Sequence, residues 1–312
     1  MLLFLALQDL TGDRFWPVTV FDWLIPFTVS VSLFLLLLSL RLRHWLAVGI
    51  LGVVTLASFW NLRGLWSDGY NPAPNRGRVY TVMTHNAGNG LADPGLLVSV
   101  LRSSQADIIG LQEITPAQSR AIDLGLAAKS PYRILFGDGI PGKGLLSKYP
   151  IKSYSQLHFY PDRPDLLATI QLPDGPMTVI VAHPPPPRLH SDGIYINSAT
   201  RQQMDSLLNV ASQGGPLLLM GDFNMTALST QHARLRSLGL VDSYQVSGEG
   251  LGFTLPMRWK NIPLLPLARV DYIWHSEHFQ SLKSWIGSST GSDHLPVLTQ
   301  LQWDYSISKS LQ

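Results

Sequence analysis

Two long apolar runs near the amino terminus restrict how this chain can be arranged. They cover Thr19–Leu40 and Trp45–Leu62, and each approaches the ~20 residues that a helix needs to cross a bilayer. Only Arg41–His44 separates them, so two helices formed by these runs would lie antiparallel as a hairpin. Neither run carries a polar face that recurs every 3.6 residues, which argues against a buried hairpin in a soluble protein.

The charges beside these runs predict how the hairpin sits in a membrane. Arg41 and Arg43 lie in the turn, and arginines next to a membrane span favour the cytoplasmic side. Both chain ends would then face outward, on the periplasmic side of the inner membrane. The opposite insertion, which would leave the rest of the chain in the cytoplasm, is the alternative.

Composition agrees with a chain divided between lipid and water. Charged residues make up 14% of the sequence, below the roughly 25% of soluble domains. We expect a membrane anchor over residues 1–64 with spans at about 19–40 and 45–62, a linker over 65–78, a folded domain over 79–304 and a tail over 305–312.

The net charge of +2 indicates no overall attraction for nucleic acid. The absence of cysteine excludes disulfides, thiolate nucleophiles and Cys-ligated zinc.

From residue 79 onward, short apolar runs alternate with helical patterns. The expected strands are Tyr80–Thr84, Ile108–Leu111, Tyr132–Phe136, Leu145–Ser147, Ala168–Leu172, Thr178–Ala182, Leu217–Met220, Val270–Trp274 and Leu298–Trp303. The expected helices are Pro94–Ser103, Pro116–Ala128, Ala199–Ala211 and Ser229–Ser237. Many strands with interspersed helices predict an α/β domain of two packed sheets covered by helices.

Polar residues recur at the points where these apolar strands begin or end. They are Asn86, Glu113, His183, Asp222, Asn224, Asp271, Asp293 and His294. Each one alone is typical of a turn or a cap. Polar groups at strand ends collect along one edge of a sheet, however, where loops form a cleft. Together they supply oxygen and imidazole groups, which are the groups needed to hold Mg²⁺ and activate water.

Six strings at these positions are similar to the ordered motifs of the endonuclease/exonuclease/phosphatase superfamily, which has the deoxyribonuclease I-like fold. The strings are Thr84-His85-Asn86, Leu111-Gln112-Glu113, Val181-Ala182-His183, Gly221-Asp222-Phe223-Asn224, Arg269-Val270-Asp271-Tyr272 and Gly291-Ser292-Asp293-His294-Leu295-Pro296-Val297. They span nearly the whole outer domain. The resemblance implies a four-layer sandwich of two mixed β-sheets flanked by helices, in a membrane-anchored bacterial member of the superfamily.

The resemblance also implies a metal site. Glu113 would be the main ligand of a divalent cation, Asn86 would hold metal or phosphate oxygen beside it, and Asp293 would approach the metal. Such oxygen donors suit a hard cation, so Mg²⁺ or Mn²⁺ is expected. Gly88 stands two residues after Asn86, where many of the nucleases carry a carboxylate, and this departure leaves open whether one or two metals bind.

The remaining residues receive catalytic roles from the same resemblance. Asp222 would orient or deprotonate the attacking water, and Asn224, two residues on along an extended chain, would donate its amide to a phosphate oxygen. His294 would bind phosphate or take a proton while Asp271 fixes its tautomer. His183 would stabilise developing charge or assist the leaving oxygen. The sequence leaves open which group is the general base and which acid supports His183.

Other patterns have simpler interpretations. Gly287–Gly291 fits a Gly-x-Ser-x-Gly motif but lacks the helix that a serine nucleophile needs after it. Gly137–Gly142 is interpreted as a loop, and His275–His278 as an exposed turn without a third zinc ligand. Pro184–Pro187 is expected to form a stiff wall of the cleft. The aromatic and proline-rich stretch Leu251–Leu267 is either a loop packed on its own domain or a contact with the bilayer.

These observations predict a membrane-tethered, metal-dependent enzyme that hydrolyses a phosphodiester or phosphomonoester with activated water. Its expected partners are the lipid bilayer and a phosphate-ester substrate. A membrane-anchored nuclease acting on DNA or RNA is the main alternative, although the near-neutral charge does not indicate nucleic acid. A non-catalytic binding domain is a further alternative, but such relatives usually lose residues of the kind retained here at Glu113 and His294. The sequence does not fix the oligomeric state.

Overall fold

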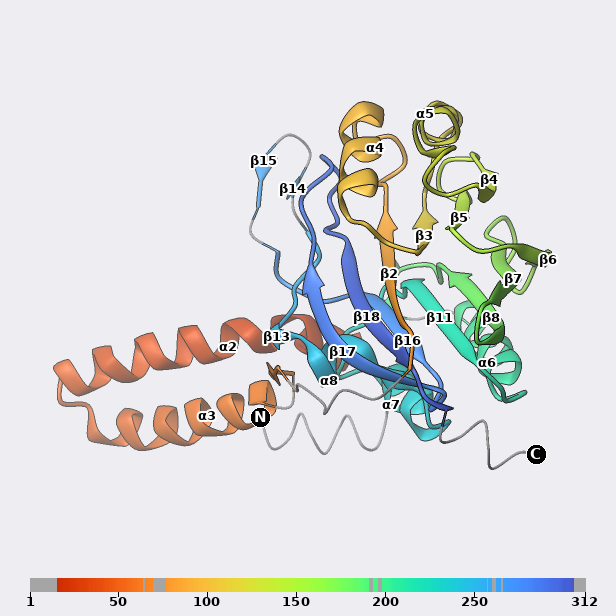
Figure 1. Cartoon of the computed structure of the whole chain (residues 1–312). Coiled ribbons are helices and arrows are strands. Elements are labelled where there is room, and N and C mark those ends of the chain that lie inside the picture. Colours follow the sequence, from red (N-terminus) through yellow and green to blue (C-terminus); the bar gives the residue numbers. More distant parts are fainter. Residues whose placement is uncertain are drawn as a thin grey trace.

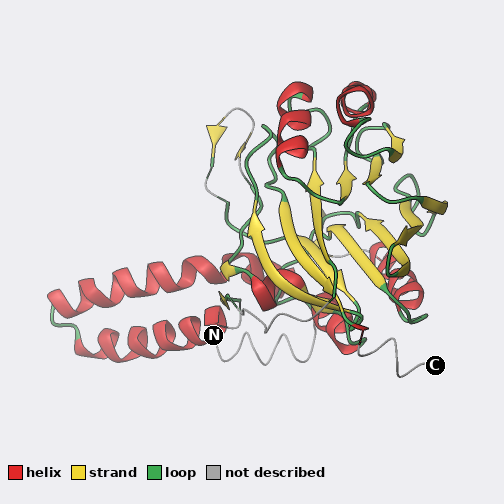
Figure 2. Ribbon diagram, in the orientation of Figure 1, coloured by secondary structure: helices red, strands yellow, loops and turns green. Residues whose placement is uncertain are grey.

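A computed structural model of the protein describes residues 16–63, 65–69, 77–190, 193–195, 198–256, 258–259, 262–264 and 266–305. The first residues of the predicted anchor, part of the predicted linker and most of the predicted tail lie outside these ranges. The described chain consists of a helical hairpin and a two-sheet domain, which Figure 1 shows along the sequence and Figure 2 shows by type of element.

The apolar runs form the predicted helical hairpin. Helix α2 spans Trp16–Arg41 and helix α3 spans Trp45–Arg63. The two helices lie side by side and project away from the two-sheet domain (Figure 1). Within the part of the chain that the structure describes, no helix has both the length and the apolar character that crossing a membrane requires. The hairpin is therefore present, and its assignment as transmembrane has no support from the structure.

The first sheet has the strand order β17-β18-β2-β3-β5-β4. Its strands are β17 (Phe279–Ile286), β18 (Val297–Trp303), β2 (Val79–Asn86), β3 (Ile108–Gln112), β5 (Lys143–Ser147) and β4 (Tyr132–Phe136). Strands β2 and β3 are parallel and the other neighbours are antiparallel, so the sheet is mixed.

The second sheet has the order β12-β16-β11-β8-β7-β6. Its strands are β12 (Val241–Asp242), β16 (Asp271–His275), β11 (Leu217–Asp222), β8 (Gly175–Ala182), β7 (Asp165–Leu172) and β6 (Ile151–Leu157). Here the parallel pair is β11 with β8. Each sheet thus has one parallel pair at its centre. Within each pair, the carboxyl ends of the two strands lie side by side at one edge of their sheet.

Alternation of buried side chains along the strands creates the layers. Ile108 packs in the core between the sheets, whereas the next residue, Ile109, packs under the helices on the outer face. Helices α4 (Pro94–Ser103) and α5 (Pro116–Leu126) cover the first sheet, and α6 (Ser198–Ala211) and α7 (Thr230–Ser237) cover the second. The predicted arrangement of two mixed sheets flanked by helices is confirmed.

Local sequence explains where the first two covering helices begin. Asp93 accepts a hydrogen bond of 2.8 Å from the backbone N–H of Leu96, and Pro94 occupies the first turn of α4. Helix α5 starts with a capping box between Thr115 and Gln118. These caps fix both helices directly beside the loops that carry site residues.

Several short elements were not expected from the sequence. Strand β1 (Ser67–Asp68) pairs with β13 (Glu249–Gly250), so part of the predicted linker is held against the domain. Short antiparallel pairs form between β9 (Arg188–His190) and β10 (Gly193–Tyr195) and between β14 (Arg258–Trp259) and β15 (Ile262–Pro263). Helix α8 covers Ser243–Ser247. A bilayer contact by the β14–β15 region stays a prediction.

Candidate active site

Strand ends bring the predicted site residues to one edge of the sandwich. Asn86 ends β2, Asp222 ends β11 and Asp271 begins β16, while Glu113 and His183 directly follow β3 and β8. Because β16 runs antiparallel to β11, the first residue of one pairs with the last residue of the other, which sets Asp271 opposite Asp222. His294 comes from the turn before β18.

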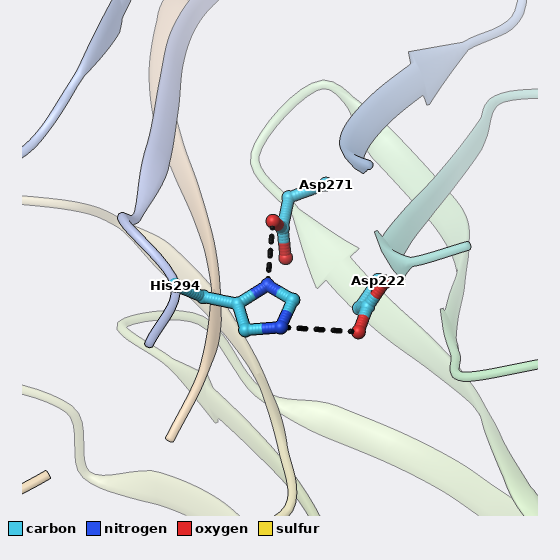
Figure 3. A group of neighbouring side chains, drawn as sticks. All are labelled: Asp222, Asp271 and His294. Carbon is cyan, nitrogen blue, oxygen red and sulfur yellow. Dashed lines mark hydrogen bonds and ion pairs between the residues drawn. The ribbon is translucent and has the colours of Figure 1, made fainter. Parts of the chain in front are cut away.

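Asp271 and His294 form a buried hydrogen-bonded pair at the centre of this edge (Figure 3). His294 Nδ1 lies 2.9 Å from Asp271 Oδ2, and His294 Nε2 lies 3.7 Å from Asp222 Oδ2. Burial lowers the pKa of His294, but the carboxylates of Asp271 and Asp222 outweigh burial and raise it to about 10. At neutral pH the imidazole is therefore a cation with Nε2–H facing Asp222.

The metal-free protein should lose stability as the pH rises towards 10. The pKa of His294 is about 10 in the folded protein and about 6.5 in an unfolded chain. Its bound proton therefore stabilises the fold fully below pH ~6.5, and this contribution disappears as the pH rises through the folded pKa. In EDTA, the melting temperature of the wild type should fall more steeply over this window than that of His294→Asn. If the melting temperatures of the wild type and His294→Asn fall in parallel with pH, the raised pKa of His294 is contradicted.

Asp222 is a buried carboxylate that faces both site histidines. Its Oδ2 accepts a hydrogen bond of 2.9 Å from Asn86 Nδ2, and its Oδ1 accepts one of 2.9 Å from the backbone N–H of Asn224. Burial raises the pKa of Asp222 to about 7, although the His294 cation opposes this shift. A carboxylate with this pKa is matched to accepting a proton near neutral pH.

The glycine before Asp222 has a steric reason. Gly221 has a φ of 151°, and a Cβ atom at this position would lie only 1.9 Å from the carbonyl oxygen of Ala182 in the neighbouring strand. No side chain fits there. Glycine therefore lets β11 approach β8 closely enough for Asp222 to meet His183, whose Nε2 lies 3.6 Å from Asp222 Oδ2.

Glu113 approaches the site from the opposite sheet. Its Oε1 lies 3.5 Å from His183 Nε2, and its side chain is 19% exposed, compared with 1% for His183. Burial raises the pKa of the Glu113 carboxyl. Burial also lowers the pKa of His183 well below its usual value, with Lys143 and Arg163 acting in the same direction. His183 is consequently a neutral imidazole between two carboxylates.

Two site residues have unusual backbone conformations. Glu113 has a φ of 54° and Asn224 a φ of 50°, in the left-handed region. The expectation that Asp222 and Asn224 share one extended strand is wrong, because β11 ends at Asp222 and the chain then turns. The Asn224 side chain is bonded to the segment after His183, because its Nδ2 donates a hydrogen bond of 3.0 Å to the carbonyl oxygen of Pro184.

The residues around Glu113 fit a divalent cation. Glu113 is the more accessible carboxylate, and both Asn86 and the negative charge of Asp293 lie close enough to affect its pKa. These are the oxygen donors that Mg²⁺ and Mn²⁺ prefer. The Oδ1 of Asn86 also accepts a hydrogen bond of 2.9 Å from the N–H of Gly88, which leaves its second lone pair for a ligand. The loop after Asn86 also lies close to Asp293, because a Cβ atom added at Gly88 would be only 2.9 Å from Asp293 Oδ1.

A second group of possible ligands suits proton transfer better. Asp222, Asp271 and His294 offer atoms within 4.8 Å of one another. A metal ligand must be deprotonated, however, and His294 is protonated with both ring nitrogens facing carboxylates. The His294 side is therefore suited to proton transfer, and the Glu113 side offers the donors that suit a cation.

Three charged residues of the site were missed from the sequence. Asp165, at the start of β7, accepts hydrogen bonds of 2.9 Å from the backbone N–H of His183 and 2.8 Å from Gln203 Nε2. This is the acid beside His183, and it holds the backbone of that residue. Lys143 starts β5 and is buried, and Arg163 precedes β7. Their only sequence signal is a charge at a strand start, which is common on exposed surfaces.

Two further histidines, His85 and His275, have structural contacts. His85 points away from the site, its Nε2 lies 2.8 Å from Thr290 Oγ1, and burial lowers its pKa to about 3. The expected exposed turn at His275–His278 is wrong, because His275 is the buried last residue of β16 and hydrogen-bonds to Ser281. Gly287–Gly291 lies between β17 and β18 with no helix after it, as expected for a loop.

Chemically, this edge combines a neutral imidazole, a cationic imidazole, a carboxylate with a pKa near neutrality and an accessible carboxylate. That set can hold a cation and a phosphate group and can remove a proton from water. Such an edge on a two-sheet α/β sandwich is suited to a hydrolase that acts on phosphate esters.

Comparison with known proteins identifies the family. The sequence model of the Endonuclease/Exonuclease/phosphatase family matches residues 83–294. The chain belongs to this family, whose members hydrolyse phosphate esters and generally depend on a divalent metal. A comparison with curated proteins found no match.

Solved structures share the fold. A mannosyl-6-phosphatase from Bacteroides thetaiotaomicron has a TM-score of 0.55 at 17% identity, covering 72% of this chain and 100% of its own. TDP2 from D. rerio, complexed with a single-strand DNA product, has a TM-score of 0.57 at 15% identity, covering 72% and 99%. A family protein from Beutenbergia cavernae has a TM-score of 0.54 at 18% identity, covering 72% of each chain. At these identities the similarity establishes the fold alone.

Proposed function

We propose that the protein is a divalent-metal-dependent hydrolase of a phosphodiester or phosphomonoester. The observation that carries this proposal is the meeting of Glu113, His183, Asp222 and the Asp271–His294 pair within hydrogen-bond or ion-pair distance at one edge of the sandwich. A domain that only binds partners has no need for a buried carboxylate whose pKa is raised to about 7 beside a histidine whose pKa is about 10.

The residues divide into three roles in this proposal. Asp222, oriented by Asn86, accepts a proton from the attacking water. The His294 cation stabilises negative charge on the phosphate, and Asp271 keeps it protonated. His183 donates a hydrogen bond to the phosphate or to the leaving oxygen. At Glu113, Asn86 and Asp293, the chemistry that Mg²⁺ or Mn²⁺ supplies is polarisation of the phosphate and compensation of its charge.

A substrate screen with matched variants tests this proposal. The full-length protein is assayed with Mg²⁺, Mn²⁺ or EDTA against sugar phosphates, nucleotides, phospholipids, DNA and RNA, beside Glu113→Ala and His294→Ala. We expect metal-dependent release of phosphate or alcohol from one class, and loss of that activity in both variants. Cleavage of DNA or RNA alone would favour a nuclease. No activity above the two variants in any class would overturn the proposal.

We further propose that the α2–α3 hairpin attaches the enzyme to a lipid bilayer, with the catalytic domain outside the cytoplasm. Large apolar side chains cover the outside of the hairpin, including Phe34, Leu46, Leu56 and Trp60, which are 65%, 81%, 72% and 70% exposed. Contiguous apolar surface of this kind is rare on water-soluble monomers and is typical of a contact with lipid or protein. The orientation rests on Arg41 and Arg43 in the turn.

Membrane fractionation should separate lipid attachment from a soluble state. The full-length protein should sediment with membranes and resist alkaline carbonate, and Leu46→Lys with Leu56→Lys should release it, because each substitution adds charge to the lipid-facing surface. Added protease should cleave the catalytic domain in cells whose outer barrier is opened but whose inner membrane is intact. Recovery of the wild type in the soluble fraction would contradict attachment, and full protection would contradict the orientation.

A further inference from the structure

A lysine lies within the sandwich beside the candidate active site. Lys143 begins β5 and is paired with Gln112, the residue before Glu113. Leu145, two residues on, belongs to the core between the sheets, so Lys143 points between the sheets as well. Its ammonium group therefore extends from the sheet that carries Glu113 towards the sheet that carries His183.

The charge of this lysine is poorly compensated by the protein. Lys143 is 1% exposed, and among the described residues its Nζ donates one hydrogen bond, of 3.1 Å, to the carbonyl oxygen of Pro141. An ammonium group has three donors, so two are left for another partner. No ion pair joins Lys143 to a carboxylate in the described part of the chain. Burying such a charge is costly unless a partner compensates it.

The nearest acids do not take the role of this partner. Asp165, Glu113 and Asp222 lie close enough to favour the charged form of Lys143, although burial lowers its pKa to about 8. Both carboxylate oxygens of Asp165 already accept hydrogen bonds, from the backbone of His183 and from Gln203. A lysine held among acids, buried, and with free donors is suited to an anion that enters the site.

We propose that Lys143 binds a non-bridging oxygen of the substrate phosphate and thereby gives the site a preference for phosphomonoesters over phosphodiesters. This inference rests on the proposed phosphoesterase function. A phosphomonoester has three oxygens without a carbon substituent and carries one more negative charge than a diester at neutral pH. The cation site at Glu113 and the imidazolium of His294 provide partners for two of those oxygens. Lys143 provides a third by a charge-assisted hydrogen bond.

Two substrates with the same leaving group test the preference. The full-length wild type and Lys143→Met are assayed with p-nitrophenyl phosphate and bis(p-nitrophenyl) phosphate. For the monoester, kcat/KM should fall by roughly 10- to 100-fold, as expected for loss of a hydrogen bond to a charged group. For the diester it should change by less than about threefold. Equal losses on both substrates would indicate a structural role and overturn the inference.

Binding of inorganic phosphate provides a readout that does not need turnover. In Mg²⁺, Lys143→Met should raise the Kd for phosphate by roughly 10-fold or more. The control is Lys148→Met, which removes a lysine at the other end of β5 that pairs with Asp107 at 2.8 Å. It should leave this Kd unchanged. Lys143→Arg keeps the charge and should retain most of the phosphate affinity, which gives a second folded variant if Lys143→Met is unstable.

The two readouts separate this inference from the proposed function. If no ester is hydrolysed but phosphate binding depends on Lys143, the phosphoesterase proposal fails and the binding role of Lys143 stands. If the wild type hydrolyses esters and Lys143→Met binds phosphate like the wild type, the proposed function stands and the inference about Lys143 is wrong.

Discussion

Asp222→Asn should lower kcat for phosphate-ester hydrolysis by roughly 10²- to 10⁴-fold, the range typical of losing a general base. The substitution keeps the size of the side chain and can retain one hydrogen bond from Asn86, but it removes the group that accepts the proton. Asp222 is suited to this role because burial raises its pKa to about 7. Its position opposite Asp271 in the sheet fixes it near His294. The measurement is steady-state kinetics on the substrate class found by the screen.

A matched control distinguishes this role from a general effect of removing an acid. Asp205→Asn changes the same side chain on helix α6, where Asp205 is 52% exposed and pairs with Arg234. It should leave kcat unchanged. Asp222→Asn should also change the Kd for Mn²⁺ by much less than Glu113→Gln does, because we assign the cation to the Glu113 side. An Asp222→Asn enzyme that retains more than a tenth of the wild-type kcat would contradict the assignment of the base.

Arg269→Met should destabilise the protein by about 3–5 kcal/mol, the cost typical of breaking a buried ion pair from one side. Arg269 Nη1 lies 2.8 Å and 2.7 Å from the two carboxylate oxygens of Asp242, and His232 Nε2 lies 3.0 Å from Asp242 Oδ2. Burial alone would raise the pKa of Asp242, but Arg269 and His232 together outweigh burial and hold the pKa well below its usual value. Without Arg269, the buried carboxylate of Asp242 loses its counter-ion.

Thermal unfolding of the full-length protein measures this effect. The control is Asp123→Asn, which breaks an ion pair with Arg133 in which the Asp123 side chain is 57% exposed. Exposed pairs contribute about 0–1 kcal/mol, so this variant should melt close to the wild type. Similar melting temperatures for Arg269→Met and Asp123→Asn would show that the buried network does not stabilise the fold as described.

The central strands of both sheets could be predicted from the sequence. Strands such as β3 and β8 are apolar runs bounded by polar residues, and the position of Glu113 after one and His183 after the other was readable from that pattern. The edge strand β4 was also predicted, but the other edge strands, β17, β12 and β6, were missed. Strand β6 (Ile151–Leu157) is mostly exposed, and its polar residues resemble a loop until pairing with β7 is known.

Contacts between the two sheets could not be predicted. Lys143 precedes a glycine and two leucines, a pattern that equally fits a lysine on the surface, and only the packing of β5 against the second sheet buries it. Asp165 is similar, because its bond to the backbone of His183 depends on the register between β7 and β8. Lys143 and Asp165 are the first residues of β5 and β7, and neither strand start carries one of the motif strings that identified Asp271 and His294.

Paramagnetic relaxation of bound phosphate tests most directly whether a cation and a phosphate share this edge of the sandwich. Full-length protein is mixed with inorganic phosphate and Mn²⁺ below the protein concentration, and ³¹P relaxation is recorded. We predict strong enhancement of ³¹P relaxation in the wild type, its loss in Glu113→Gln and its retention in Lys148→Met. Phosphate that binds without enhancement, or enhancement that persists undiminished in Glu113→Gln, would contradict a common site built around Glu113.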